Sequence, residues 1–145
     1  MGRKIFFWIL LIIYSIMIFI FSSRPEVGIG QYFYGQDKVM HFFIYGIHTF
    51  LCLLILGDKI LSLKFMQYFL ALVLSVSYGM FNEIYQYFIP EREFSFGDIL
   101  ANSLGIITFL FLIYIFQNRK QKKVNFCARH KSLQNKSKDK AINLF

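Results

Sequence analysis

Four long apolar runs constrain the fold of this chain more than any other feature of its sequence. They cover about Ile5–Phe21, Val39–Leu56, Phe65–Ile89 and Phe96–Phe116. Each run is about as long as the roughly 17–25 residues that cross a bilayer as a helix. None of them alternates apolar with polar residues, and backbone groups in lipid must find their partners within the segment, so helix is expected rather than strand. The sequence therefore predicts an all-α, polytopic membrane protein with four transmembrane helices in a compact bundle.

The composition agrees with this class. Hydrophobic residues make up 57% and aromatic residues 20% of the 145 residues, more than a soluble domain of this length can bury. The first run follows Arg3 and Lys4, as the core of a signal peptide would. It is long for such a core, however, and it ends in FIFSSRP without a small-x-small cleavage site. We expect it to remain as an uncleaved span.

Lys and Arg are spread unevenly among the segments that join the runs. The N-terminus, the central loop with Lys59 and Lys64, and the segment after Phe116 are basic. The loops 22–38 and 89–95 carry few cations, and acidic residues partly offset these. By the positive-inside rule, both termini and the central loop are expected in the cytoplasm, with the other two loops outside.

The chain divides into two parts near residue 116. Residues 1–116 are expected to form the four-helix membrane domain, and residues 117–145 a basic cytoplasmic tail. Most of the net charge of +8 lies in this tail, which we expect to be disordered or to lie on anionic lipid headgroups. No folded nucleic-acid reader accompanies it, so nucleic acid is not an expected partner. Cys52 and Cys127 lie at different levels, so no disulfide is expected.

Polar residues inside three of the runs fall near the same expected side of the membrane. They are Lys38, His41 and Tyr45 in the second run, Glu83 and Gln86 in the third, and Asp98, Asn102 and Gly105 in the fourth. Within each run, spacings of three or four residues put them on one helical face. Most lie on the order of 5–10 Å below the outer boundary, at about 1.5 Å per residue. A charge in the bilayer costs roughly 2.5–3.5 kcal/mol, so we expect these groups to meet in an outward-facing polar pocket.

Glu83 is the most costly member of this set, since it is too short to reach the water and too deep to be fully wet. We expect it to pair with His41, or with Lys38 or Arg92 from the rim. The alternative is that the polar stripes only join the helices, because hydrogen bonds between spans contribute about 0.6 kcal/mol on average and need no further role. His48, further along the second run, is expected to be an interior group with satisfied hydrogen bonds.

The same residues carry a resemblance to a known family. Asp37, Lys38, His41, Phe42 and Tyr45 form DKxxHFxxY, the third run ends in NEIYQYFIPER, and a DxxxNxxG motif starts the fourth run. Over residues of about 15 to 112 this pattern resembles the VanZ-like family of small bacterial membrane proteins. The resemblance implies a multi-pass protein of the bacterial cytoplasmic (plasma) membrane. The family takes its name from a protein associated with resistance to the glycopeptide teicoplanin, which suggests cell-envelope biology and antibiotic resistance but no particular reaction.

Two functions from different classes fit these residues. In the first, the pocket binds an anionic lipid or cell-wall precursor without turnover, and the expected ligand-binding residues are Lys38, His41, Tyr45, Glu83, Gln86, Arg92, Asp98 and Asn102. The chain departs from the family pattern at Arg92, because the acids Glu91 and Glu93 flank it. Their negative charge is expected to weaken the binding of an anion there. In the second, a membrane-embedded hydrolase or transferase acts on such a lipid, with His41 as acid or base and Glu83 or Asp98 as its orienter.

Neither a catalytic nor a cofactor signature supports the enzyme. The sequence has no G-x-S-x-G nucleophile context and no H-E-x-x-H metal helix, so we expect no metal or cofactor. A proton-coupled carrier or small channel is a third class. It is disfavoured because the inner half of the second run, at Cys52, Leu53 and Leu54, lacks the polar groups that a conduction path needs.

Overall fold

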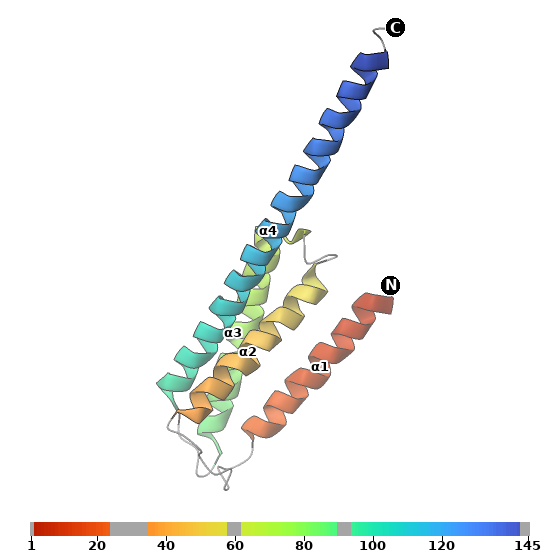
Figure 1. The fold of residues 1–145 in the computed structure, drawn as a ribbon. Helices are drawn as coiled ribbons and strands as arrows, with labels where there is room; N and C mark the ends of the chain where they lie inside the picture. The colour runs from red at the N-terminus through yellow and green to blue at the C-terminus, as the bar shows by residue number, and fades with distance from the viewer. Residues whose placement is uncertain (1, 24–34, 58–61, 90–93, 143–145) are drawn as a thin grey trace.

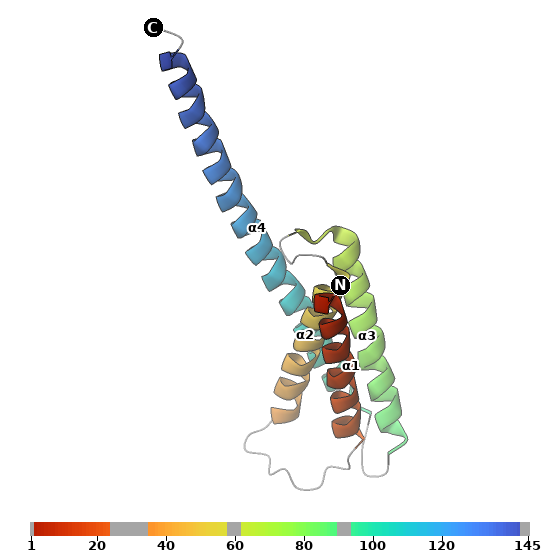
Figure 2. The ribbon, with the colours of Figure 1, turned by 90° about the vertical axis from the view of Figure 1, so that its right-hand side faces the viewer.

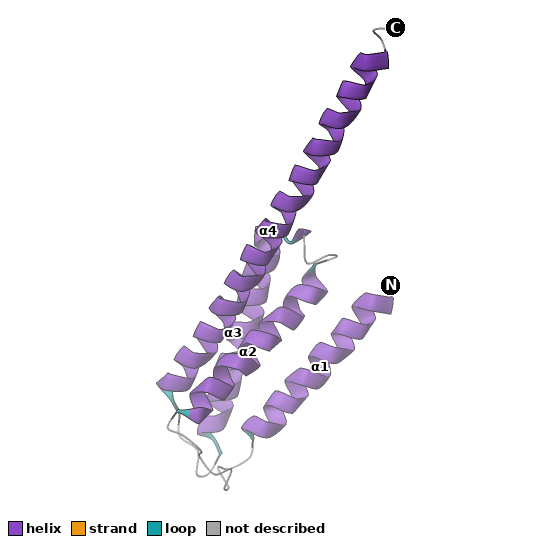
Figure 3. Cartoon of the chain, in the orientation of Figure 1, coloured by secondary structure: helices purple, strands orange, loops and turns teal. Residues whose placement is uncertain are grey.

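The computed structural model describes residues 2–23, 35–57, 62–89 and 94–142 (Figure 1). They form four α-helices, α1 (Gly2–Ser22), α2 (Gln36–Leu56), α3 (Phe65–Tyr87) and α4 (Phe96–Ile142). Figure 3 shows helix and short loops, but no strand, in this part of the chain. All four helices are long and apolar enough to cross a membrane. The predicted all-α bundle with four candidate spans is confirmed.

The helices run alternately in opposite directions (Figures 1 and 2). The starts of α1 and α3 and the ends of α2 and α4 therefore lie toward one end of the bundle, which we call the terminal end. The opposite end, where α2 and α4 begin and α1 and α3 finish, we call the polar end. This arrangement places the two termini on the same side, as the expected topology requires; the assignment of that side to the cytoplasm stays a prediction.

The helix starts have local causes in the sequence. Gly35 precedes α2 with a φ of 84°, a left-handed conformation that glycine adopts without the strain of a Cβ atom. At the start of α3, the Gln67 side chain accepts a hydrogen bond from the Lys64 N–H at 2.6 Å and donates to the Leu56 carbonyl at 2.9 Å. These bonds satisfy backbone groups at the helix ends and fix α3 against the end of α2.

The bundle carries large apolar side chains on its outside and polar side chains in its interior. Phe65 and Phe96 are exposed, whereas Ser75, Asn82 and Glu83 are almost fully buried. A soluble domain of this size keeps such acids and amides at its surface. Lipid hydrocarbon, in contrast, favours apolar side chains on the outside and polar groups in the interior. Together with the four candidate spans, this pattern defines a multi-pass membrane protein.

Two glycines let α2 and α4 approach closely. A Cβ atom on Gly105 would clash with the backbone carbonyl of Phe42 in α2, and one on Gly46 would clash with the ring of Phe109 in α4. Small residues at such crossings bring the backbones of membrane helices together. The polar faces of α2 and α4 are therefore adjacent, which positions the site described below.

The last helix is longer than the sequence predicts. The predicted span ends near Phe116, whereas α4 continues as one helix to Ile142. The reason is local, because no Gly or Pro follows Gly105 before Ile142 and the tail is rich in Lys, Arg and Gln, which favour helix. Gln117 is buried, donates to the Leu63 carbonyl at 3.0 Å and accepts from the Tyr68 hydroxyl at 2.6 Å. Beyond this anchor, α4 projects past the rest of the bundle (Figure 2). The position of the tail on anionic lipid headgroups stays a prediction.

Candidate functional site

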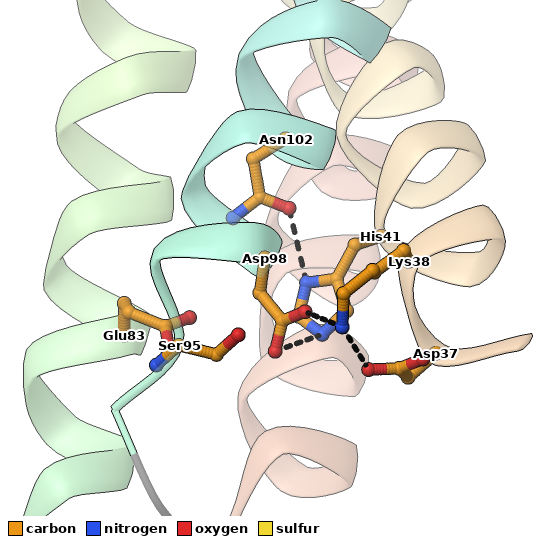
Figure 4. A network of polar contacts seen from close by, with 7 residues as sticks. All are labelled: Asp37, Lys38, His41, Glu83, Ser95, Asp98 and Asn102. Atoms are coloured by element: carbon orange, nitrogen blue, oxygen red, sulfur yellow. Dashed lines mark hydrogen bonds and ion pairs between the residues drawn. The ribbon is translucent and has the colours of Figure 1, made fainter. Parts of the chain in front are cut away.

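Side chains from α2 and α4 form a connected network at the polar end (Figure 4). The ammonium nitrogen of Lys38 lies 2.8 Å from Asp37 Oδ2 and 3.3 Å from Asp98 Oδ1. His41 uses both ring nitrogens: Nδ1 lies 3.0 Å from Asn102 Oδ1, and Nε2 lies 3.9 Å from Asp98 Oδ2. We call these residues, Asp37, Lys38, His41, Asp98 and Asn102, the polar cluster.

Helical spacing and close packing together produce the polar cluster. Lys38 and His41 are three residues apart on α2, and Asp98 and Asn102 are four residues apart on α4, so each pair shares a face. Gly105, one turn beyond Asn102, has no Cβ atom to clash with the Phe42 backbone, so α4 packs closely against α2 and the two faces meet. The predicted convergence of the stripes from the second and fourth runs is therefore confirmed.

Burial changes from the rim of the cluster inward. The side chains of Lys38 and Asp37 are 47% and 36% exposed, whereas those of His41 and Asp98 are 16% and 12% exposed. Asp98 lies in the first turn of α4, where the unpaired backbone N–H groups favour a negative charge. The cluster thus presents a lysine at its opening and keeps an acid and an imidazole beneath it.

Glu83 reaches the polar end from α3, but its described contact differs from the expected one. It is almost fully buried, and its Oε1 accepts a hydrogen bond from the Ser95 N–H at 2.8 Å, directly before α4 begins. A carboxylate there satisfies a backbone donor that the helix cannot use. The two basic side chains of the polar cluster, Lys38 and His41, both contact Asp98. Arg92, the third expected partner, lies outside the described residues.

Tyr45 and Gln86 are the two remaining expected site residues. Tyr45 is buried one turn below His41, and the two rings are nearly parallel, with centroids 6.2 Å apart and an interplanar angle of 11°. Gln86 is buried on the same face of α3 as Glu83. Both lie in the interior, and neither takes part in the hydrogen-bonded network of the polar cluster within the described residues.

Asn82 is one of several buried polar residues that sequence reasoning did not single out. Asn82 donates from Nδ2 to the Tyr78 carbonyl at 3.0 Å, and its Oδ1 is buried without a hydrogen-bond partner in the described part of the chain. Its position next to Glu83 in an apolar run could have identified Asn82, because exposing either polar side chain to lipid is costly.

His48 forms the centre of a second polar group in the middle of the bundle. Its Nδ1 lies 3.2 Å from Ser75 Oγ, its Nε2 lies 3.3 Å from Ser15 Oγ, and its ring stacks on Tyr78 with centroids 4.9 Å apart. These contacts join α2 to α3 and α1. The prediction that His48 is a satisfied interior group is confirmed.

The chemistry available to the polar cluster follows from these contacts. No group of three or more His, Cys, Asp or Glu residues is arranged to hold a metal ion among the described residues. A lysine ammonium has three N–H donors, and two carboxylates accept from Lys38 here. The remaining donor, at the half-exposed rim, is suited to an oxygen atom of a ligand.

Comparison of the chain with protein-family models, with curated proteins and with solved structures gave no match. The fold and the site define the class of the protein: a four-helix, multi-pass membrane protein with a partly buried polar cluster at one end of the bundle. The resemblance to the VanZ-like family stays a prediction that depends on the motifs in the sequence.

Proposed function

We propose that this chain is a VanZ-like integral membrane protein of the bacterial cell envelope whose polar cluster binds an anionic lipid or a lipid-linked cell-wall precursor. The observation that carries the proposal is the position of Lys38. Its side chain is half exposed at the rim, and its ammonium group contacts Asp98 and Asp37. A cation fixed at the polar end of the bundle, beside apolar walls, suits the phosphate of a lipid whose chains stay in the membrane.

Charge balance decides how such a ligand would bind. The two acids beside Lys38 compensate its charge, so a phosphate must compete with one of them. Asp37 is the more exposed of the two, whereas Asp98 is mostly buried and also faces His41. In this proposal Asp98 positions the side chains of Lys38 and His41, and the phosphate of the ligand displaces Asp37 from the Lys38 ammonium group. The cluster therefore favours a group that brings at least one negative charge of its own.

Further residues complete the proposed site. Arg92 would supply a second cation, as a planar donor that suits phosphate or carboxylate. Tyr45 and Gln86 would donate hydrogen bonds to headgroup oxygens, Asn102 would donate to an oxygen of the same lipid, and Glu83 would keep the start of α4 in place through its bond to Ser95. By the positive-inside rule the site faces the outer leaflet of the plasma membrane. A link to glycopeptide resistance follows from the family resemblance alone.

Lys38→Met tests the proposal directly. We expect it to weaken binding of a labelled phosphatidylglycerol to purified protein about fivefold, because one basic residue near a membrane surface contributes roughly 1 kcal/mol. Lys64→Met is the matched control, since it removes the same charge at the terminal end. Equal losses in the two variants would show binding to net charge rather than to the polar cluster, and would overturn the proposal.

Asp37→Asn tests the competition between ligand and carboxylate. If phosphate displaces Asp37 from Lys38, the neutral side chain should bind the same labelled lipid a few-fold more tightly, by the same charge argument. A titration monitored by fluorescence measures the change. Weaker binding in Asp37→Asn would mean that the carboxylate holds the lysine for the ligand, and would contradict the role assigned to it.

The membrane-embedded enzyme is the second candidate, and one contact favours it. Asp98 Oδ2 lies 3.9 Å from His41 Nε2, an acid–imidazole pair of the kind that orients a general base. The other ring nitrogen faces Asn102, however, so both nitrogens of His41 are directed at protein atoms. Incubation of the purified protein with envelope lipids, followed by mass spectrometry, separates the two functions. Products that disappear in His41→Gln, with lipid binding intact, would favour the enzyme.

A further inference from the structure

A groove on the flank of the bundle adjoins the polar cluster. It lies between α3 and α4 and is lined by Val76, Gly79, Met80, Ile99, Asn102, Ser103 and Ile106. Its volume is about 50 Å³, and it is partly open to the surroundings. Met80 at its edge is half exposed, on a surface that membrane hydrocarbon would cover.

One residue belongs to both the groove and the polar cluster. Asn102 is only 4% exposed, and its Oδ1 accepts the hydrogen bond from His41. Its Nδ2 points the other way, toward α3 (Figure 4), and lies 3.6 Å from where a Cβ on Gly79 would be. No hydrogen bond of this Nδ2 is found within the described residues. A buried amide thus aims an unused N–H donor into a groove whose other walls are mostly apolar.

From this geometry we propose that the groove binds the upper part of an acyl chain of a glycerophospholipid, and that Asn102 Nδ2 donates to its ester carbonyl. This inference rests on the proposed function, because it takes the headgroup of the same lipid to lie at Lys38. Asn102 is four residues beyond Asp98, or about 6 Å further along α4. An ester carbonyl lies a short distance below the phosphate in a bilayer, so one lipid reaches both positions.

The hydrogen-bond chemistry selects the class of lipid. An N–H donor in an apolar groove needs an acceptor oxygen, because burying an unpaired donor costs free energy. A diacyl lipid offers an ester carbonyl at this depth, whereas an isoprenoid chain attached directly to phosphate offers only hydrocarbon. The groove therefore favours acyl-ester lipids over prenyl phosphates.

Photo-crosslinking tests the inference. We would incorporate a phosphatidylglycerol with a diazirine near the top of one acyl chain into nanodiscs with the full chain, and map the adducts by mass spectrometry. We expect adducts on the groove residues Val76, Met80 and Ile99, and a loss of at least fivefold in Ser103→Phe, whose ring fills the groove. Leu104→Phe is the matched control, because Leu104 is exposed on the outer face of the same helix. Adducts spread evenly over lipid-facing residues, or unchanged in Ser103→Phe, would overturn the inference.

Two further arms separate this inference from the proposed function. A diether lipid with the same headgroup and chains lacks the carbonyl, and we expect it to bind about fivefold more weakly than the diester. Equal binding of the two lipids would overturn the role of Asn102. Groove adducts that persist in Lys38→Met, with unchanged affinity, would uphold the groove but reject the headgroup site. Weaker binding in Lys38→Met, with no groove adducts in the natural chain, would uphold the headgroup site at Lys38 but reject the groove.

Discussion

Among the described contacts that join α2 to α4 in the polar cluster, the hydrogen bond from His41 Nδ1 to Asn102 Oδ1 is the shortest, at 3.0 Å. Hydrogen bonds between membrane helices contribute about 0.6 kcal/mol on average and about 1.7 at most. We expect a double-mutant cycle of His41→Phe and Asn102→Leu to give a coupling free energy in this range. Reversible unfolding in detergent measures it. The control cycle pairs His41→Phe with Gln117→Leu at the terminal end, where distant changes should add.

The choice of acid at the polar cluster shows where prediction from residues stops. Helical spacing was enough to predict that Lys38 and His41 share a face, and that Asp98 and Asn102 share another. It could not decide whether Glu83 or Asp98 would meet the two basic groups, because that depends on which helices touch. The close approach at Gly105 decides it, by placing Asp98 against α2 and leaving Glu83 to bond the Ser95 N–H.

At the level of the helices, the polar cluster forms only where α2 and α4 cross closely. A Cβ on Gly105 would meet the Phe42 backbone, which cannot rotate away, so the helices would have to separate. We expect Gly105→Ala to lower the free energy of unfolding by about 1–3 kcal/mol, as overpacking does. It should also weaken lipid binding, because Asp98 would move away from Lys38.

Alanine substitutions at two other glycines serve as controls for Gly105→Ala. A Cβ on Gly79 would lie 3.2 Å from the Tyr45 ring, a tight contact with a side chain, so Gly79→Ala should destabilise less than Gly105→Ala. Gly2 has nothing within 4 Å of its Cβ position, so Gly2→Ala should leave stability unchanged. If Gly105→Ala unfolded at the same denaturant concentration as Gly2→Ala, the crossing would not limit stability.

The extent of α4 could not be predicted from hydropathy. The apolar pattern stops near Phe116, and hydropathy marks where a helix leaves lipid, not where the helix ends. The buried Gln117 holds the helix at that boundary through Tyr68 and Leu63. From there its continuation depends mainly on helix propensity, since Arg119 to Lys123 are exposed.

For the whole molecule, the distribution of charge and the arrangement of the helices give one topology. All of the net charge of +8 lies in residues 117–145, because the cations and acids of residues 1–116 are equal in number. This charge projects from the terminal end, whereas the polar cluster opens at the opposite end (Figures 1 and 4). The positive-inside rule then predicts that the cluster lies on the outer side of the membrane.

The native cysteines make this topology testable. Cys127 is exposed on the projecting part of α4, and Cys52 is buried, so a membrane-impermeant maleimide has one accessible target in the natural chain. We expect intact cells to leave Cys127 unlabelled and permeabilised cells to label it. The variant Phe96→Cys with Cys127→Ser moves the target to an exposed position at the polar end, and intact cells should label it. Labelling of Cys127 in intact cells would invert the topology, and the lipid bound at Lys38 would then belong to the cytoplasmic leaflet.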